Sequence, residues 1–102
     1  MKPGFSSIAL RDLDRVYDEV FTASRSYEIT EQYIDDLLKT IEDKVDFPLS
    51  ASPLYYEDLF TGYYYVRFKA YISFCHVVQD QIFVDRILFA ASDYLKILFG
   101  KD

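Results

Sequence analysis

The sequence has few of the residues that build disulfides or metal sites, and few residues that break regular structure. One cysteine, Cys75, and one histidine, His76, occur in 102 residues. A single cysteine excludes an internal disulfide, and a structural zinc site needs more Cys and His ligands than these two. Three glycines and three prolines leave long stretches free to form helices and strands. We therefore expect no metal and no cofactor.

The sequence also lacks a long apolar run and an excess of positive charge. No apolar run approaches the roughly 20 residues of a membrane span, and residues 1–4 do not lead into the apolar stretch of a signal peptide. Eleven basic and 17 acidic residues give a net charge of −6, which provides no general attraction to phosphate backbones. The sequence predicts a soluble cytoplasmic protein that does not bind nucleic acid through charge alone.

The composition and the spacing of apolar residues predict one domain over residues 1–102, beginning with a helical hairpin. With 51% hydrophobic residues the chain can fill a core. Apolar residues recur every three or four positions over 8–23 and again over 28–46, which indicates two amphipathic helices. The expected apolar stripes include Ile8, Leu10 and Ile29, whereas Asp12 falls among the acidic residues of the solvated face. Phe47-Pro48 is expected to end the second helix.

The second half of the chain has the composition of a β-sheet. Residues 63–68, 71–78 and 82–88 are rich in aromatic and β-branched side chains and predict three antiparallel strands joined by short turns. Residues 49–61 are expected to lack regular structure, and residues 94–99 predict a short helix that ends at Gly100. The predicted fold is α+β, with the helical hairpin packed on an antiparallel sheet of three to four strands and a short C-terminal helix or tail.

The order of these elements, together with three groups of residues, resembles the RelE/ParE family of toxins from type II toxin–antitoxin modules. The first group opens helix one, the second ends helix two, and the third lies in the last strands and at the start of the C-terminal helix. They are Ser6, Ala9, Asp12, Leu13, Val16 and Tyr17; Phe47-Pro48; and Tyr71-Ile72-Ser73-Phe74, Arg86-Ile87-Leu88 and Asp93-Tyr94.

The resemblance implies a growth-inhibiting toxin of a plasmid-stabilisation system, neutralised by a cognate antitoxin. Members of the RNase branch cleave ribosome-bound mRNA with basic strand residues and a terminal His or Tyr. This chain has Ile72 and Phe89 where that branch has Arg and His, so Arg67, Arg86 and Tyr94 remain as catalytic candidates. The resemblance therefore favours the ParE-like branch, which binds DNA gyrase and is not enzymatic. The alternatives are a ribosome-dependent mRNA endonuclease and a degenerate member without toxicity.

The family usually begins with a strand that precedes helix one, and residues 1–6 leave little room for it. We expect this strand to be short or missing. One edge of the sheet would then lie open, and an open edge is a template for another chain. An antitoxin segment or a second copy in a homodimer is the expected occupant.

Three side chains that can carry chemistry have simpler structural explanations. Arg86 follows Asp85, so the two are expected on opposite faces of a strand, and a buried ion pair is the favoured role for Arg86. His76 is expected to be packed and hydrogen-bonded and not catalytic. Cys75 is expected to pack as a small apolar group.

Tyrosines cluster in the middle of the chain, at positions 55, 56, 63, 64 and 65. Exposed tyrosine is common at protein interfaces because it buries a large area with little loss of rotamer freedom. We expect the partner-binding surface, with the antitoxin as the first partner, to include Tyr64, Tyr65, Arg67, Asp93 and Tyr94.

Overall fold

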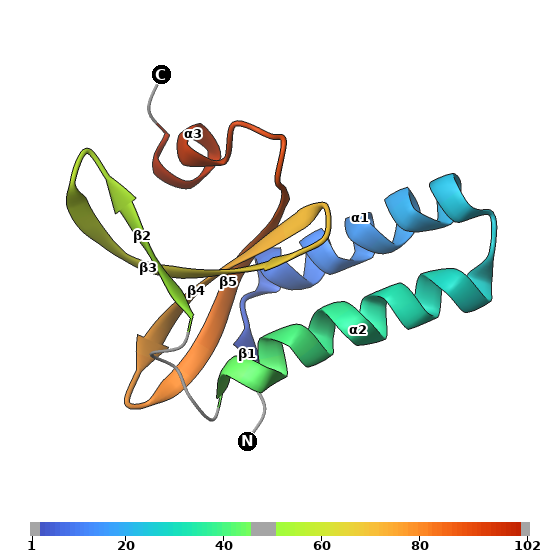
Figure 1. The fold of residues 1–102 in the computed structure, drawn as a ribbon, viewed down its shortest axis with the longest axis horizontal. Helices are drawn as coiled ribbons and strands as arrows, with labels where there is room; N and C mark the ends of the chain where they lie inside the picture. The colour runs from blue at the N-terminus through green and yellow to red at the C-terminus, as the bar shows by residue number, and fades with distance from the viewer. Residues whose placement is uncertain (1–2, 46–50, 101–102) are drawn as a thin grey trace.

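The computed structural model describes residues 3–45 and 51–100 as a single sheet with helices on both faces (Figure 1). The α+β fold class is confirmed. Within these two ranges, no helix has the length and apolar character needed to cross a bilayer. The elements in chain order are β1 (Gly4–Phe5), α1 (Ser7–Ser24), α2 (Tyr27–Val45), β2 (Ser52–Tyr56), β3 (Leu59–Phe68), β4 (Tyr71–Val78), β5 (Gln81–Phe89) and α3 (Tyr94–Phe99).

The sheet has five strands in the order β1-β5-β4-β3-β2. Strands β2 to β5 are antiparallel to their neighbours, whereas β1 runs parallel to β5. The three strands expected from the sequence are present, and β4 has the expected bounds. The sheet is nevertheless mixed and contains more strands than expected, because both β1 and β2 are short elements without a clear sequence pattern.

The segment 49–61, expected to be irregular, forms most of a hairpin over the residues that the structure describes. Strands β2 and β3 meet at a two-residue turn in which Glu57 and Asp58 have φ values of 51° and 67°. Two successive positive φ values are typical of the type I′ turn, which matches the twist of the strands it joins. Glutamate is unusual at such a position, so residues 57–58 carry no strong turn signal.

Strand β1 has two residues and depends on the absence of a side chain at Gly4. The pairs Gly4–Phe83 and Phe5–Val84 join it to β5. A Cβ atom at position 4 would lie 2.6 Å from ring carbons of Phe83. Glycine therefore allows the backbone to pass under this ring. The expectation of a short first strand is confirmed.

Helix α1 is close to its expected bounds, but its inner face differs from the expected stripe. Ser6 caps it, since Ser6 Oγ accepts a hydrogen bond of 2.9 Å from the backbone N–H of Ala9. Ile8 and Leu10 are exposed, whereas Asp12 is buried with 6% of its surface exposed. The assignment of Asp12 to the solvated acidic face was wrong, because its charge is satisfied inside the protein.

Helix α2 is described as far as Val45, so the expected end at residue 46 and the stop at Phe47-Pro48 lie outside the described residues. Its inner face does not begin where the sequence pattern indicated. Ile29 is 57% exposed, and Thr30 is fully buried in its place. The Thr30 hydroxyl donates a 2.7 Å hydrogen bond to the carbonyl of Ser26, which satisfies this buried polar group within the helix.

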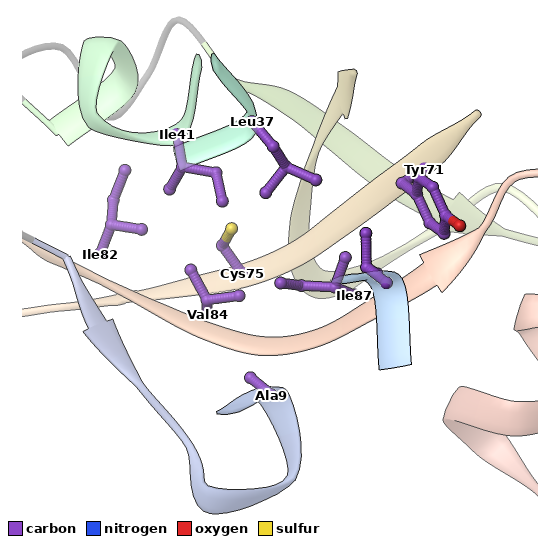
Figure 2. Packing of buried hydrophobic residues seen from close by; sticks show 9 residues of the cluster. Ala9, Leu37, Ile41, Tyr71, Cys75, Ile82, Val84 and Ile87 are labelled. Atoms are coloured by element: carbon purple, nitrogen blue, oxygen red, sulfur yellow. The ribbon is translucent and has the colours of Figure 1, made fainter. Parts of the chain in front are cut away.

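Two hydrophobic cores lie on opposite faces of the sheet. In the larger core, residues from α1 and α2 pack on side chains of β4 and β5 (Figure 2). In the smaller core, α3 packs on the other face through Tyr94, Leu98 and Phe99, which contact Phe74 and its neighbours. The members of the larger core are Ala9, Val16, Leu37, Ile41, Tyr71, Cys75, Ile82, Val84 and Ile87.

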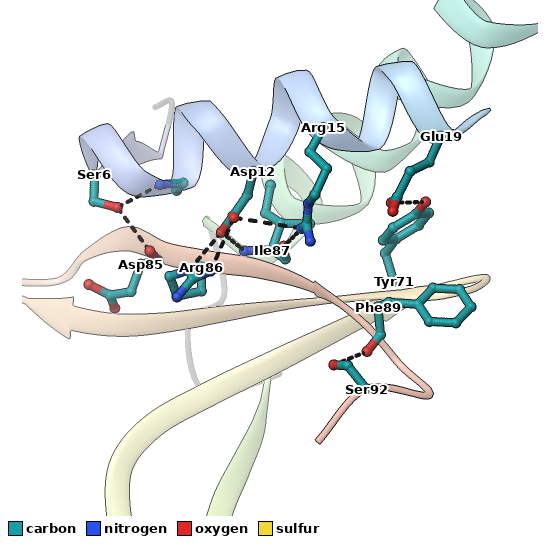
Figure 3. A network of polar contacts seen from close by, with 11 residues as sticks. Ser6, Asp12, Arg15, Glu19, Tyr71, Asp85, Arg86, Ile87, Phe89 and Ser92 are labelled. Carbon is teal, nitrogen blue, oxygen red and sulfur yellow. Dashed lines mark hydrogen bonds and ion pairs between the residues drawn. The ribbon is translucent and has the colours of Figure 1, made fainter. Parts of the chain in front are cut away.

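Side chains of α1 close the outer edge of β5 (Figure 3). The Asp12 carboxylate accepts a 2.9 Å hydrogen bond from the backbone N–H of Ile87, and Arg15 donates a 2.6 Å hydrogen bond to the Ile87 carbonyl. Nearer the start of the helix, the backbone N–H of Ser6 donates to the carbonyl of Val84. The expectation of an open edge here was wrong, because polar groups of α1 take the place of a longer first strand.

A β-bulge at Asp85 corrects the expected orientation of Arg86. Cys75 pairs with Val84 and Phe74 pairs with Arg86, which leaves Asp85 as an extra residue in β5. Asp85 and Arg86 consequently lie on the same face, where both line a small pocket against α3. The two side chains do not point to opposite faces as simple alternation predicts.

Removal of the Asp12 carboxylate is expected to destabilise the protein strongly. In an Asp12→Ala variant, the partly buried Arg86 guanidinium and the buried Ile87 N–H both lose their hydrogen-bond acceptor. Removing one partner of a buried ion pair costs about 3–5 kcal/mol. Urea denaturation measures the loss. The matched Asp14→Ala variant, at an exposed position of the same helix, is expected to change the free energy of unfolding by less than about 0.5 kcal/mol. Equal effects of the two substitutions would contradict the structural role of Asp12.

Candidate functional site

Three of the residues expected at a functional site share one pocket on the α3 side of the sheet. Tyr65, Arg67 and Tyr94 line a cavity of about 230 Å³. Alternation places Tyr65 and Arg67 on one face of β3, and α3 brings Tyr94 over that face, with its ring centroid 5.3 Å from that of Phe74. The apolar part of the wall is made by Leu54, Ile72 and Phe74.

Arg67 provides the cationic group of this pocket. Its side chain is exposed, and its Nε donates a 3.0 Å hydrogen bond to the carbonyl of Lys69. A second cavity of about 250 Å³ shares Tyr65 and Arg67 with the first and also has Lys44 in its wall. The second cavity thus places Lys44, from the end of α2, beside the strand that carries Tyr65 and Arg67.

The other two expected partner-binding residues lie elsewhere. Tyr64 pairs with Cys75, which faces the helical hairpin, so its side chain is on the opposite face from Tyr65. Its ring lies 5.4 Å from that of Phe60. Asp93 is exposed at the start of α3, where its carbonyl accepts a hydrogen bond from Ile97 N–H. The five residues therefore do not form one surface.

Arg86 is held by Asp12 in a two-point ion pair. Arg86 Nε lies 2.8 Å from Asp12 Oδ2, and Arg86 Nη2 lies 3.2 Å from Asp12 Oδ1. Arg15 adds a longer contact of 3.6 Å to the same carboxylate. This confirms the expected ion pair, with α1 supplying the partner. Because the bidentate contact directs the guanidinium toward α1, Arg86 is not part of the pocket that holds Arg67 and Tyr94.

His76 is hydrogen-bonded, as expected, and its partner is the bulged residue. Its Nδ1 lies 2.6 Å from Asp85 Oδ2, and its ring stacks on Phe83 with centroids 5.6 Å apart. The side chain is 40% exposed, so the ring is packed on one side and open on the other. Within residues 3–45 and 51–100, there is no group of three or more His, Cys, Asp or Glu side chains that could hold a metal ion.

A large apolar groove was not anticipated from the sequence. It has a volume of about 620 Å³ and lies between the far ends of α1 and α2, the β3–β4 turn and the end of β5. Its polar feature is a 2.8 Å hydrogen bond that the Tyr71 hydroxyl donates to Glu19 Oε1. Burial, followed by this contact with Glu19, raises the pKa of Tyr71 well above its usual range. The lining residues are Glu19, Val20, Ala23, Ser24, Ile29, Tyr33, Ala70, Tyr71 and Phe89, which come from separate segments and carry no common sequence signal.

Comparison with protein families identifies the chain. Residues 5–94 match the model of the ParE toxin of the type II toxin–antitoxin system parDE. The chain belongs to the ParE toxin family. The resemblance to RelE/ParE toxins and its preference for the ParE-like branch agree with this match. No curated protein matches the chain significantly.

Solved structures of toxin–antitoxin systems share the fold of this ParE-family protein. A chain of the chromosomal ParDE toxin–antitoxin system from P. aeruginosa superposes with a TM-score of 0.70 at 16% identity, over 87% of this chain and 95% of the other. A chain of the RelB–RelE antitoxin–toxin complex from Methanococcus jannaschii gives a TM-score of 0.54 at 18% identity, over 94% of this chain and 98% of the other. At these identities the likeness establishes the fold alone.

The cysteine of this ParE-family chain is a core residue. Cys75 is 1% exposed and packs among the apolar residues of the larger core. Burial, with a smaller contribution from the charge of Asp85, raises the pKa of the Cys75 thiol to about 12. The expectation that it packs as a small apolar group is confirmed.

Cys75 is consequently expected to resist thiol reagents in the folded protein. At pH 8 an aromatic disulfide reagent needs an accessible thiolate, and both access and ionisation are suppressed here. The absorbance of the released thiol should rise slowly in native buffer and quickly in a denaturing concentration of urea, which serves as the control. A fast reaction of the native protein would show that β4 opens readily.

Proposed function

We propose that this type II toxin acts by binding a protein target, with DNA gyrase as the expected one, and that it does not cut covalent bonds. The observation that supports this most directly is the engagement of Arg86 by Asp12. Phosphoryl transfer depends on cations aimed at the charge that develops in the transition state. An arginine held by a carboxylate on α1 is poorly placed for that task.

The charge of the whole chain supports the same proposal. With 17 acidic and 11 basic residues, the protein carries a net charge of −6. A ribosome-dependent nuclease must approach a dense array of phosphates, and a negative protein gains no electrostatic attraction from it. A protein partner with basic groups is the better electrostatic match.

The mRNA endonuclease function stays a second candidate because of the pocket on the sheet face. Tyr65, Arg67 and Tyr94 converge there, and Lys44 lines the adjacent cavity. A tyrosine hydroxyl and a guanidinium in one pocket are groups that acid–base and charge stabilisation of RNA cleavage could use. Arg67 is the residue on which this alternative depends.

Induced expression separates the two functions. We expect growth arrest with intact transcripts, and inhibition of gyrase supercoiling by the purified protein. An Arg67→Ala variant is expected to keep growth arrest and gyrase inhibition. If the protein is a nuclease, the same substitution should abolish cleavage of mRNA. Primer extension on cellular mRNA is the measurement, and transcripts cut at ribosomal A-site codons would contradict the proposal. Absence of any growth effect would identify a degenerate member.

We assign the antitoxin contact to the apolar groove at the far end of the helical hairpin. Exposed apolar side chains on its rim, such as Ile29 and Phe89, are typical of a surface that a partner covers. The groove is open between two helices and carries the negative charge of Glu19. An amphipathic helix of the antitoxin, with an apolar face and a basic residue opposite Glu19, fits this chemistry.

An Ile29→Lys variant tests this assignment. The Ile29 side chain is 57% exposed, so the free energy of unfolding should change little. The new charge in the groove is expected to weaken antitoxin binding by about 2 kcal/mol, or roughly thirtyfold in Kd. Titration calorimetry with the purified antitoxin measures the effect. Leu10→Lys, at an exposed apolar position of α1 outside the groove, is the matched control, and equal affinity of the two variants would contradict the assignment.

A further inference from the structure

We propose that the β2–β3 hairpin is a second binding surface, separate from the antitoxin groove, and that it binds the toxin's target through an apolar patch with a basic rim on that protein. This inference rests on the proposed function and specifies which part of the toxin contacts its target. It is supported by the aromatic side chains of the hairpin, by their attachment to α3 and by the charge of the hairpin.

One side of the hairpin carries a continuous row of aromatic rings. The ring centroids of Tyr55 and Phe60 are 5.9 Å apart, and those of Phe60 and Tyr64 are 5.4 Å apart. Tyr55 is 57% exposed, and Phe60 is 48% exposed. We call Tyr55, Phe60 and Tyr64 the hairpin patch. A row of neighbouring exposed apolar side chains of this kind marks an interaction surface more often than isolated ones do.

The other side of the hairpin is braced by α3. The ring of Phe99 lies 6.0 Å from that of Tyr56 and 5.9 Å from that of Tyr63. These contacts hold the protruding hairpin against the smaller core. Because the hairpin is held before binding, the hairpin patch can bind a partner with little loss of conformational entropy.

Charge limits the kind of partner. Residues 51–66 contain Glu57 and Asp58 and no lysine or arginine. Both acidic residues lie in the turn at the tip of the hairpin. A protein surface with an apolar centre and basic residues around it complements this arrangement, whereas nucleic acid would be repelled.

A second copy of this chain fits less well. Two hairpins packed together would bring their acidic turns into one negatively charged assembly. Pairing through the free edge of β2 is also disfavoured, because Pro53 has no N–H to donate to an added strand. The target protein is therefore the occupant to which we commit.

The hairpin patch and the groove can be occupied at the same time. Figure 1 shows the β2–β3 turn and the α1–α2 connection at opposite ends of the molecule. The groove is lined by residues of α1, α2 and the ends of β4 and β5, and it shares no residue with the hairpin patch. Two separate surfaces suit a protein that must bind both an inhibitor and a target.

The test substitutes the two most exposed members of the hairpin patch, Tyr55→Ser with Phe60→Ser. After induction in cells, this variant is expected to lose growth arrest while the purified protein keeps its affinity for the antitoxin, which also shows that it is folded. The control variant combines Leu10→Ser with Val78→Ser, two exposed apolar positions outside both surfaces. It should arrest growth as the unmodified protein does.

A second variant tests the charge. Glu57→Asn with Asp58→Gly removes both acidic groups and keeps residues that favour a type I′ turn. This variant is expected to weaken growth arrest at an equal level of protein, again with unchanged antitoxin affinity. Full growth arrest would overturn the assignment of a basic rim to the partner.

Three further results would overturn the proposal. Full growth arrest by the Tyr55→Ser/Phe60→Ser variant would show that the hairpin patch does not bind the target. Loss of antitoxin affinity in that variant would assign the patch to the antitoxin, as the sequence-based expectation for Tyr64 has it. A dimer of the unmodified protein that the two substitutions dissociate in light scattering would assign it to a second copy. If the unmodified protein causes no growth arrest, the proposed function itself fails, which is a distinct outcome.

Discussion

The carboxylate of Asp12 is the contact on which the arrangement of this protein depends. It binds the guanidinium of Arg86 and the backbone N–H of Ile87, and both belong to β5. Arg15, one turn further along α1, binds the carbonyl of the same Ile87. These contacts fix α1 along the outer edge of the sheet. A first strand of two residues is then sufficient, because side chains of the helix satisfy the edge that a longer strand would have covered.

The same contacts bear on function. Arg86 neutralises the buried carboxylate of Asp12, so its guanidinium is engaged inside the fold. Two other parts of the surface combine apolar and acidic side chains: a groove beside Glu19 at one end and a braced aromatic hairpin at the other. Surfaces of this kind bind proteins through burial of apolar area and charge complementarity.

The sequence predicted those parts of the fold that have a regular local pattern. Strand β4 was placed correctly because β-branched and aromatic residues fill it, and α1 was placed because apolar residues recur at helical spacing. The helical pattern wrongly predicted that Asp12 is exposed. Periodicity assigns a charged residue to the solvated face, and it cannot detect the ion pair with Arg86, which lies 74 residues away. The sequence pattern also failed at Glu57 and Asp58, where the positive φ values follow from the pairing of β2 with β3 and not from a residue that prefers them.

The candidate site was predictable only to the extent that neighbouring residues share one strand. Tyr65 and Arg67 converge because side chains alternate along β3, whereas the bulge at Asp85 moved Arg86 away from the face that alternation predicts. The groove could not be predicted from the sequence. Its lining comes together only when the helical hairpin packs on the sheet, as for Glu19, Ile29, Tyr71 and Phe89. No pattern within one segment marks such a meeting.

Amide hydrogen exchange at Ile87 tests the central role of Asp12 most directly. The Ile87 N–H points away from β4 at the outer edge of the sheet, and its acceptor is a side chain of α1. If Asp12 closes this edge permanently, the Ile87 amide exchanges only when the whole protein unfolds, with the same free energy as the slowest core amides. Exchange at the rate of an exposed edge strand, while the core amides stay protected, would contradict this account.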